Sequence, residues 1–155
     1  MRTCASRNIC APHTPGPVYV TKGDTTFSVW RYPADPELPA LFLACSPEHM
    51  SALLGMPVSV ELMSYRPTRR AVVRVRAANS VSYAKVARPP QVESLAKRHI
   101  MLSRAGIPAP PVLIHDVRGL LVIGAANGIP LSTAISRGMG RNAAPLLGSL
   151  TALLN

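Results

Sequence analysis

The amino-acid sequence predicts an α+β fold, in which an antiparallel sheet carries one main helix. Runs of β-branched residues broken by short polar turns recur between residues 58 and 87, which is typical of a strand meander. Apolar residues then repeat every three or four positions over residues 91–105, which indicates a helix packed on one face. The 16 prolines and the low aromatic content of 5% favour a turn-rich fold with an aliphatic core.

The first 39 residues predict a leader and a β-hairpin. Residues 1–17 are rich in proline and are expected to be a disordered leader. β-Branched and aromatic residues over 18–21 and 25–32 predict two strands, and Gly23 between them predicts the hairpin turn. The three prolines of residues 33–39 exclude regular structure in that segment.

A short helix follows and completes a predicted N-terminal extension over residues 18–56. Ser46 offers an N-cap hydroxyl, Pro47 suits the first helical position, and Glu48 places an acid in the first turn. Gly55 and a proline two residues later are expected to end this helix.

The region 57–128 predicts the main sheet and its helix. Three strands joined by polar turns come first, over residues 58–65, 71–76 and 81–87. The helix over residues 91–105 carries the apolar stripe Val92, Leu95, Ala96, His99 and Leu102. Two more extended runs follow, over residues 111–115 and 119–125. The remaining residues, 129–155, predict short helices.

The chain is strongly basic. Lys and Arg outnumber Asp and Glu 17 to 7, and the resulting net charge of +10 favours anionic partners such as nucleotides or nucleic acid. Cys4, Cys10 and Cys45 form no CxxC pair and leave one thiol over, which argues against a zinc knuckle or a disulfide scaffold and favours the cytoplasm. No apolar stretch approaches the roughly 18 residues that a membrane-spanning helix needs, so no membrane partner is expected.

Five stretches of the sequence, taken together, resemble one enzyme family. In order along residues 29–131 they read VWRYPADPELPAL, YRPTRRAVVRV, YAKVARP, AGIPAPPVLIHD and GLLVIGAANGIPL. By these motifs the chain resembles the nucleotide-binding lobe of the aminoglycoside phosphotransferase-like family, preceded by a short extension. The resemblance implies a protein-kinase-like small lobe, ATP with magnesium as the cofactor, and phosphate transfer to a small hydroxylated acceptor.

Two residues are expected near the phosphates of ATP. By the resemblance, Lys85 pairs with the α- and β-phosphates, a role that suits a flexible point charge on a rigid strand. The alternative is an ordinary strand lysine that faces solvent. A helix carboxylate would hold this lysine in the family, and Glu93 is the only acid of the predicted helix. The alternative for Glu93, which its spacing favours, is an exposed i,i+4 pair with Lys97.

Four further residues complete the nucleotide site that the resemblance implies. The turn over the phosphates contains Arg69 and Arg70 in place of glycines, so arginine side chains would make the phosphate contacts there. Ala125 and Ala126 fall where the family's hinge offers backbone groups to adenine. The alternatives are a solvated basic turn and an ordinary strand end.

No catalytic residues are expected in this chain. No Asp or Glu follows Asp116, and none of the four histidines is followed two positions later by Asp, so the HxD loop and the magnesium-binding acid of the family have no counterpart. Residues 129–155 are therefore expected to be the truncated start of a helical catalytic lobe. We expect a lobe that is inactive alone and that has a missing catalytic lobe as a partner.

Two other classes of function stay open. Ten Lys or Arg lie between Arg66 and Arg104 against the single acid Glu93, which would also suit a nucleic-acid-binding module. Only Tyr83 offers an aromatic face for base stacking in this region. An unrelated small α+β binding domain is the other alternative.

The last residues predict a surface for self-association. A leucine stripe recurs there at helical spacing behind Asn142, made of Leu146, Leu147, Leu150, Leu153 and Leu154. An apolar face of this kind has to be covered by the chain itself or by another molecule. Self-association is the outcome expected in the absence of a catalytic lobe.

Overall fold

The computed structural model describes residues 16–126, 128–129, 131–136, 148 and 152. The chain divides into two units, residues 1–125 and 126–155, which are described separately. Among the described residues, the first unit contains every strand, and the second contains helix α4 (Leu131–Ser136). The predicted leucine stripe, Leu146, Leu147, Leu150, Leu153 and Leu154, lies outside the described residues.

Strands β1 (Val18–Lys22) and β2 (Thr25–Val29) form the predicted hairpin. Gly23 in the turn has φ 59°, a left-handed conformation that glycine adopts without a Cβ clash. The second strand ends earlier than predicted, because Val29 already pairs with Val18, the first residue of β1, and Pro17 before it has no backbone N–H to extend the pairing. The next residue, Trp30, donates its indole N–H to the hydroxyl of Tyr65 at 3.3 Å.

Two short helices follow, α1 (Leu41–Ala44) and α2 (Pro47–Leu54). Helix α2 begins and ends as predicted: the Ser46 hydroxyl accepts the His49 backbone N–H at 3.2 Å, and Gly55 closes the helix with φ 71°. Helix α1 was not predicted, because it has no side-chain cap and is a single turn of four residues.

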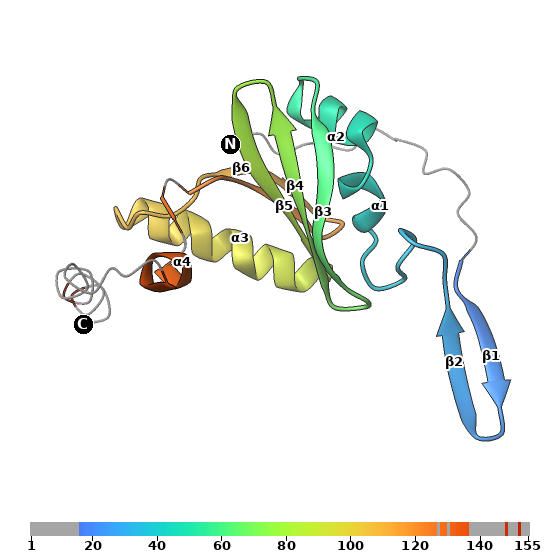
Figure 1. Ribbon diagram of the computed structural model, residues 1–155. Helices are drawn as coiled ribbons and strands as arrows, with labels where there is room; N and C mark the ends of the chain where they lie inside the picture. Colours follow the sequence, from blue (N-terminus) through green and yellow to red (C-terminus); the bar gives the residue numbers. More distant parts are fainter. Residues whose placement is uncertain (1–15, 127, 130, 137–147, 149–151, 153–155) are drawn as a thin grey trace. The chain divides into compact units, whose positions relative to one another are not determined.

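Five strands form the main sheet: β3 (Ser59–Arg66), β4 (Arg70–Ala77), β5 (Ser80–Ala87), β6 (Val112–Asp116) and β7 (Leu120–Gly124). Their order across the sheet is β3-β4-β5-β7-β6, and every neighbouring pair is antiparallel. The last strand therefore lies inside the sheet, between β5 and β6 (Figure 1). This sheet confirms the predicted α+β class.

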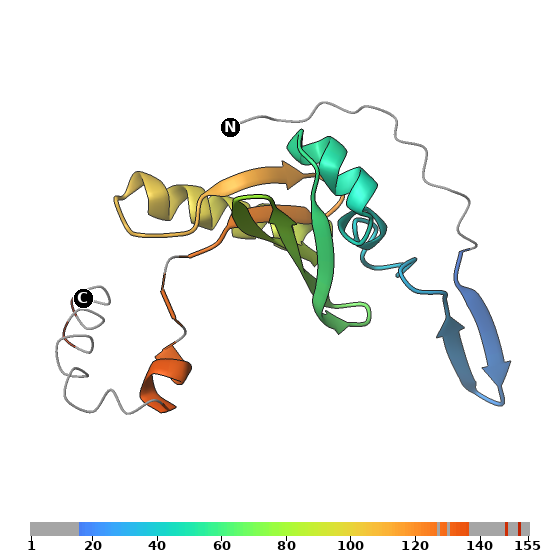
Figure 2. The ribbon, with the colours of Figure 1, turned by 45° about the horizontal axis from the view of Figure 1, so that its top comes forward.

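The two faces of the sheet pack on different helices (Figure 2). On one face the side chains of α1 and α2 join the strands in the larger core, which includes Leu41, Met50, Val73, Val86 and Val122. On the opposite face, helix α3 (Pro89–Arg104) buries Val92 and Ala96 against Leu121 and Ile123. The main contacts of α3 are with β5, β6 and β7, so it covers one half of that face.

Candidate functional site

Lys85 lies on the face of the sheet that carries α3. Its neighbours on β5, Ala84 and Val86, are buried in the larger core on the other face. Successive strand residues point to opposite faces, so Lys85 shares its face with Tyr83 and Ala87, which pack beside α3. The structure thus settles the orientation that strand alternation alone left open, and Lys85 is half-buried.

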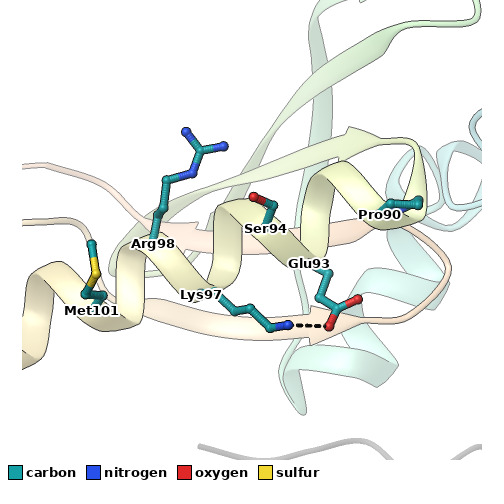
Figure 3. Close-up of a pocket in the computed structure, with 6 residues that line it drawn as sticks. All are labelled: Pro90, Glu93, Ser94, Lys97, Arg98 and Met101. Atoms are coloured by element: carbon teal, nitrogen blue, oxygen red, sulfur yellow. Dashed lines mark ion pairs between the residues drawn. The ribbon is translucent and has the colours of Figure 1, made fainter.

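Glu93 forms an ion pair with Lys97. The Lys97 Nζ lies 2.8 Å from Glu93 Oε1, and the hydrogen bond lowers the pKa of Glu93 below its usual range. Both side chains are exposed, at 57% for Glu93 and 74% for Lys97, and Figure 3 shows them on the surface of the helix beside Ser94 and Arg98. The i,i+4 pair expected from the sequence is therefore confirmed, and a phosphate-site role for Glu93 stays a prediction.

A shallow pocket of about 360 Å³ covers this part of α3. It is lined by Pro90, Glu93, Ser94, Lys97, Arg98 and Met101 (Figure 3). All six residues come from one helix and are exposed. A surface that one helix supplies alone offers no convergent polar groups for a small ligand, in contrast to the pocket described next.

A second pocket, of about 520 Å³, forms where two parts of the sheet meet the beginning of α3. We call it the arginine pocket, and it is lined by Arg66, Arg69, Arg70, Ala87, Arg88 and Gln91. These residues come from the turn between β3 and β4, the end of β5 and the beginning of α3. The structure brings Arg69 and Arg70, which were predicted from sequence, together with Arg66, Arg88 and Gln91, which were not.

The strand register connects the arginine pocket to Lys85. Across β4 and β5, Arg70 pairs with Ala87, and Val72 pairs with Lys85. Lys85 therefore lies two residues before Ala87 on the same face, roughly 7 Å along the strand. A phosphate chain longer than one phosphate could contact both.

The electrostatics of the arginine pocket are strongly positive. Arg66, Arg69 and Arg70 form no ion pair with any residue in the described part of the chain, and Arg88 pairs only with Glu37, at 3.0 Å. Helix α3 begins here with no acid in its first turn, so its dipole adds positive potential. Such a surface attracts anions.

The buried carboxylate of Asp35 fixes the turn that carries the arginines. Asp35 is 3% exposed, and its Oδ2 accepts the Tyr65 hydroxyl at 2.8 Å and the Thr68 backbone N–H at 2.7 Å. Its Oδ1 accepts the Glu37 backbone N–H at 2.9 Å. Thr68 has φ 60°, which is rare for a β-branched residue and persists only where surrounding contacts enforce it.

The same segment also holds the first residues of α3. Glu37, two residues after Asp35, supplies the carboxylate that pairs with Arg88. Residues 33–39 thus contact both sides of the arginine pocket, the β3–β4 turn through Asp35 and the beginning of α3 through Glu37. Sequence reasoning excluded regular structure there but missed this role, because the hydrogen bonds of Asp35 to Tyr65 and Thr68 join residues at least 30 positions apart.

The predicted hinge lies at the end of β7. The Ala125 backbone N–H donates to the Val81 carbonyl at 3.2 Å, which continues the β5–β7 pairing in which Leu121 faces Lys85. Ala125 is exposed and lies beside Val81. Val81 is four residues before Lys85 on β5, so the two are roughly 13 Å apart along the strand. Ala126 is also exposed and belongs to the second unit, with which it is described.

Within the part of the chain that the structure describes, no group of three or more His, Cys, Asp or Glu residues could hold a metal ion. None of the described helices is long and apolar enough to cross a membrane. Comparisons with protein-family models, with curated proteins and with solved structures found no match to this chain.

Proposed function

We propose that this chain is the ATP-binding lobe of an aminoglycoside phosphotransferase-like small-molecule kinase, which is inactive without a catalytic lobe. The observation that carries the proposal is the pairing of β5 with β7. Through this pairing Ala125, at the expected adenine end, lies beside Val81 of β5, four residues before Lys85 at the expected phosphate end. The element order of three strands, one helix and two strands also agrees with the order that the sequence resemblance implies.

Each candidate residue has a separate task in this proposal. Lys85 would neutralise the charge of the α- and β-phosphates from the sheet face that carries α3. Arg69 and Arg70 would contact the phosphates from the turn, because no glycine there lets the backbone approach them. The Ala125 N–H already binds Val81, so the adenine contact at this residue would use its carbonyl group.

Magnesium does not fit the residues that line the arginine pocket. Mg²⁺ prefers carboxylate and water oxygens in octahedral geometry. The lining offers four guanidinium groups and one amide, and no carboxylate belongs to it. Magnesium binding is accordingly assigned to the catalytic lobe, and this chain alone is expected to hydrolyse ATP only at the background rate.

A binding titration of ATP with matched lysine variants tests the proposal. Lys85→Ala is expected to weaken ATP binding about tenfold to a hundredfold, because one charge-assisted contact contributes about 1.5–3 kcal/mol. Lys97→Ala removes the same charge from the exposed surface of α3 and is expected to change affinity less than about twofold. Equal losses in the two variants would mean that general basicity accounts for the binding.

Nucleic-acid binding is the weaker proposal. Two of the basic residues outside the arginine pocket, Arg74 and Arg76, lie 2.7 and 3.6 Å from the carboxylate of Glu61, which reduces their net charge toward a phosphate backbone. Tyr83, the aromatic residue of this region, packs in the cluster under α3. Salt-dependent binding of oligonucleotides without any binding of ATP would favour this alternative.

A further inference from the structure

We propose that the arginine pocket binds polyphosphate chains without a divalent cation. The proposal deepens the proposed function, because it concerns the phosphate end of the same site. It rests on the proposed function for the identification of ATP as the molecule that carries the phosphate chain. It also departs from the cofactor that the sequence resemblance implies, in which magnesium neutralises the phosphates.

The lining of the pocket supplies the charge that a metal ion would otherwise supply. Four of its six residues are arginines, and three of these, Arg66, Arg69 and Arg70, form no ion pair with a carboxylate in the described ranges. A guanidinium group is planar, stays charged at every relevant pH and binds phosphate oxygens through two parallel hydrogen bonds. Four positive groups around one cavity would also repel a cation.

The backbone that carries the arginines is held by contacts with residues 35 and 37. Asp35 fixes the β3–β4 turn through Thr68, and Glu37 fixes the beginning of α3 through Arg88. Both acids belong to one segment, so the turn and the helix cannot separate without breaking these contacts. Pre-organisation of this kind lowers the backbone entropy that the turn loses when its arginines bind a ligand.

The dimensions of the pocket favour a chain of phosphates over a single phosphate. Its volume of about 520 Å³ is that of a small-molecule site. Lys85 lies two residues before Ala87, which lines the pocket, on the same face of β5, so a chain of two or three phosphates could contact Lys85 and the arginines together. A single phosphate could contact only part of this set.

Calorimetric titration of the full chain with sodium tripolyphosphate in EDTA tests the proposal. We expect binding that weakens as salt is raised, and inorganic phosphate is expected to bind at least tenfold more weakly. The double variant Arg69→Gln/Arg70→Gln should lower the affinity for tripolyphosphate at least tenfold. Excess Mg²⁺ should weaken binding in the unmodified chain, because the ion competes with the arginines for the same oxygens.

A matched control removes two charges elsewhere on the same unit. Arg98→Gln/Arg104→Gln lies on exposed positions of α3 outside the arginine pocket, and it should change the affinity less than twofold. Circular dichroism of both double variants checks that the fold is retained. Equal losses in the two double variants, or tripolyphosphate binding that requires Mg²⁺, would overturn the proposal.

ATP and adenosine distinguish this proposal from the proposed function. If ATP binds no more tightly than tripolyphosphate in EDTA and adenosine does not compete with it, the pocket binds polyphosphate but the nucleotide proposal fails. If ATP binds only with Mg²⁺ and its affinity depends on Lys85, the proposed function stands and the metal-independent site is wrong.

Discussion

Asp35 is the residue on which the candidate site depends most. A buried carboxylate is costly unless hydrogen bonds satisfy it, and Asp35 accepts three. Two of them, from Tyr65 and Thr68, reach the sheet and its turn more than 25 residues away in sequence. The arginine pocket is thus positioned by a residue that is not among its lining residues.

Asp35→Asn is expected to weaken both the fold and the pocket. The amide group places N–H donors where Asp35 now accepts, so at least one of the bonds from Tyr65, Thr68 and Glu37 is lost. The free energy of unfolding should fall by about 1–3 kcal/mol, measured by urea denaturation. The affinity for tripolyphosphate should fall as well, because the segment that holds the β3–β4 turn is less firmly bonded.

Asp24→Asn is the control for this prediction, since Asp24 lies in the exposed turn of the β1–β2 hairpin. It should leave the unfolding free energy and the affinity unchanged. A variant at Asp35 that loses stability but binds tripolyphosphate with full affinity would show that the carboxylate does not position the arginines.

At the scale of elements, the turn between β6 and β7 closes tightly against the end of β5. Gly119 has φ 98°, and a Cβ at this position would collide with the carbonyl oxygen of Ala87. The Ala87 N–H also donates to the Gly119 carbonyl at 3.1 Å. Because Ala87 lines the arginine pocket, the close approach of Gly119 to Ala87 fixes the position of one side of the pocket.

Gly119→Ala is therefore expected to destabilise the first unit by more than about 2 kcal/mol, since backbone strain and a backbone clash act together. Gly106→Ala is a matched control: Gly106 has φ 72° but nothing within 4 Å of the added Cβ, so only the left-handed backbone costs energy, about 1–2 kcal/mol. Urea denaturation of the two variants measures the difference. Equal losses would mean that the approach of Gly119 to Ala87 is not restrictive.

The elements that local sequence signals specify could be predicted. Ser46 and Gly55 mark the two ends of α2, and the β-branched runs and the stripe that contains Val92 mark the strands and α3. Strand order depends on contacts far apart in sequence, so the position of β7 inside the sheet could not be derived. Helix α1 carries no capping residue to mark its beginning.

The site could be predicted only in part, for the same reason. Lys85, Arg69 and Arg70 were found because they fall in motifs that resemble a family. Arg88 joins them through the packing of α3 on the sheet, and the role of Asp35 arises from hydrogen bonds across 30 or more residues. Neither relation leaves a local pattern in the sequence.

At the scale of the whole molecule, the basic charge and the C-terminal leucines make opposite predictions. A net charge of +10 favours a monomer through mutual repulsion. The predicted helix face of leucine would favour association, since burial contributes roughly 25 cal/mol per Å² of apolar surface. Charge repulsion between molecules is screened beyond about 8 Å at physiological salt, whereas apolar burial is not. Association should therefore prevail in physiological salt and decrease as salt is removed.

Light scattering on two forms of the chain tests this prediction. The intact chain should form dimers or larger species at 0.15 M salt, and a form that ends at Arg141 should stay monomeric. Polyphosphate should not disrupt the association of the intact chain, because the described residues that line the arginine pocket all precede residue 92 in the sequence. An intact chain that is monomeric at every salt concentration would show that the leucines are covered within the molecule. Association of both forms would instead assign the contact to residues 1–141, among which the β1–β2 hairpin exposes Val18, Tyr19, Phe27 and Val29.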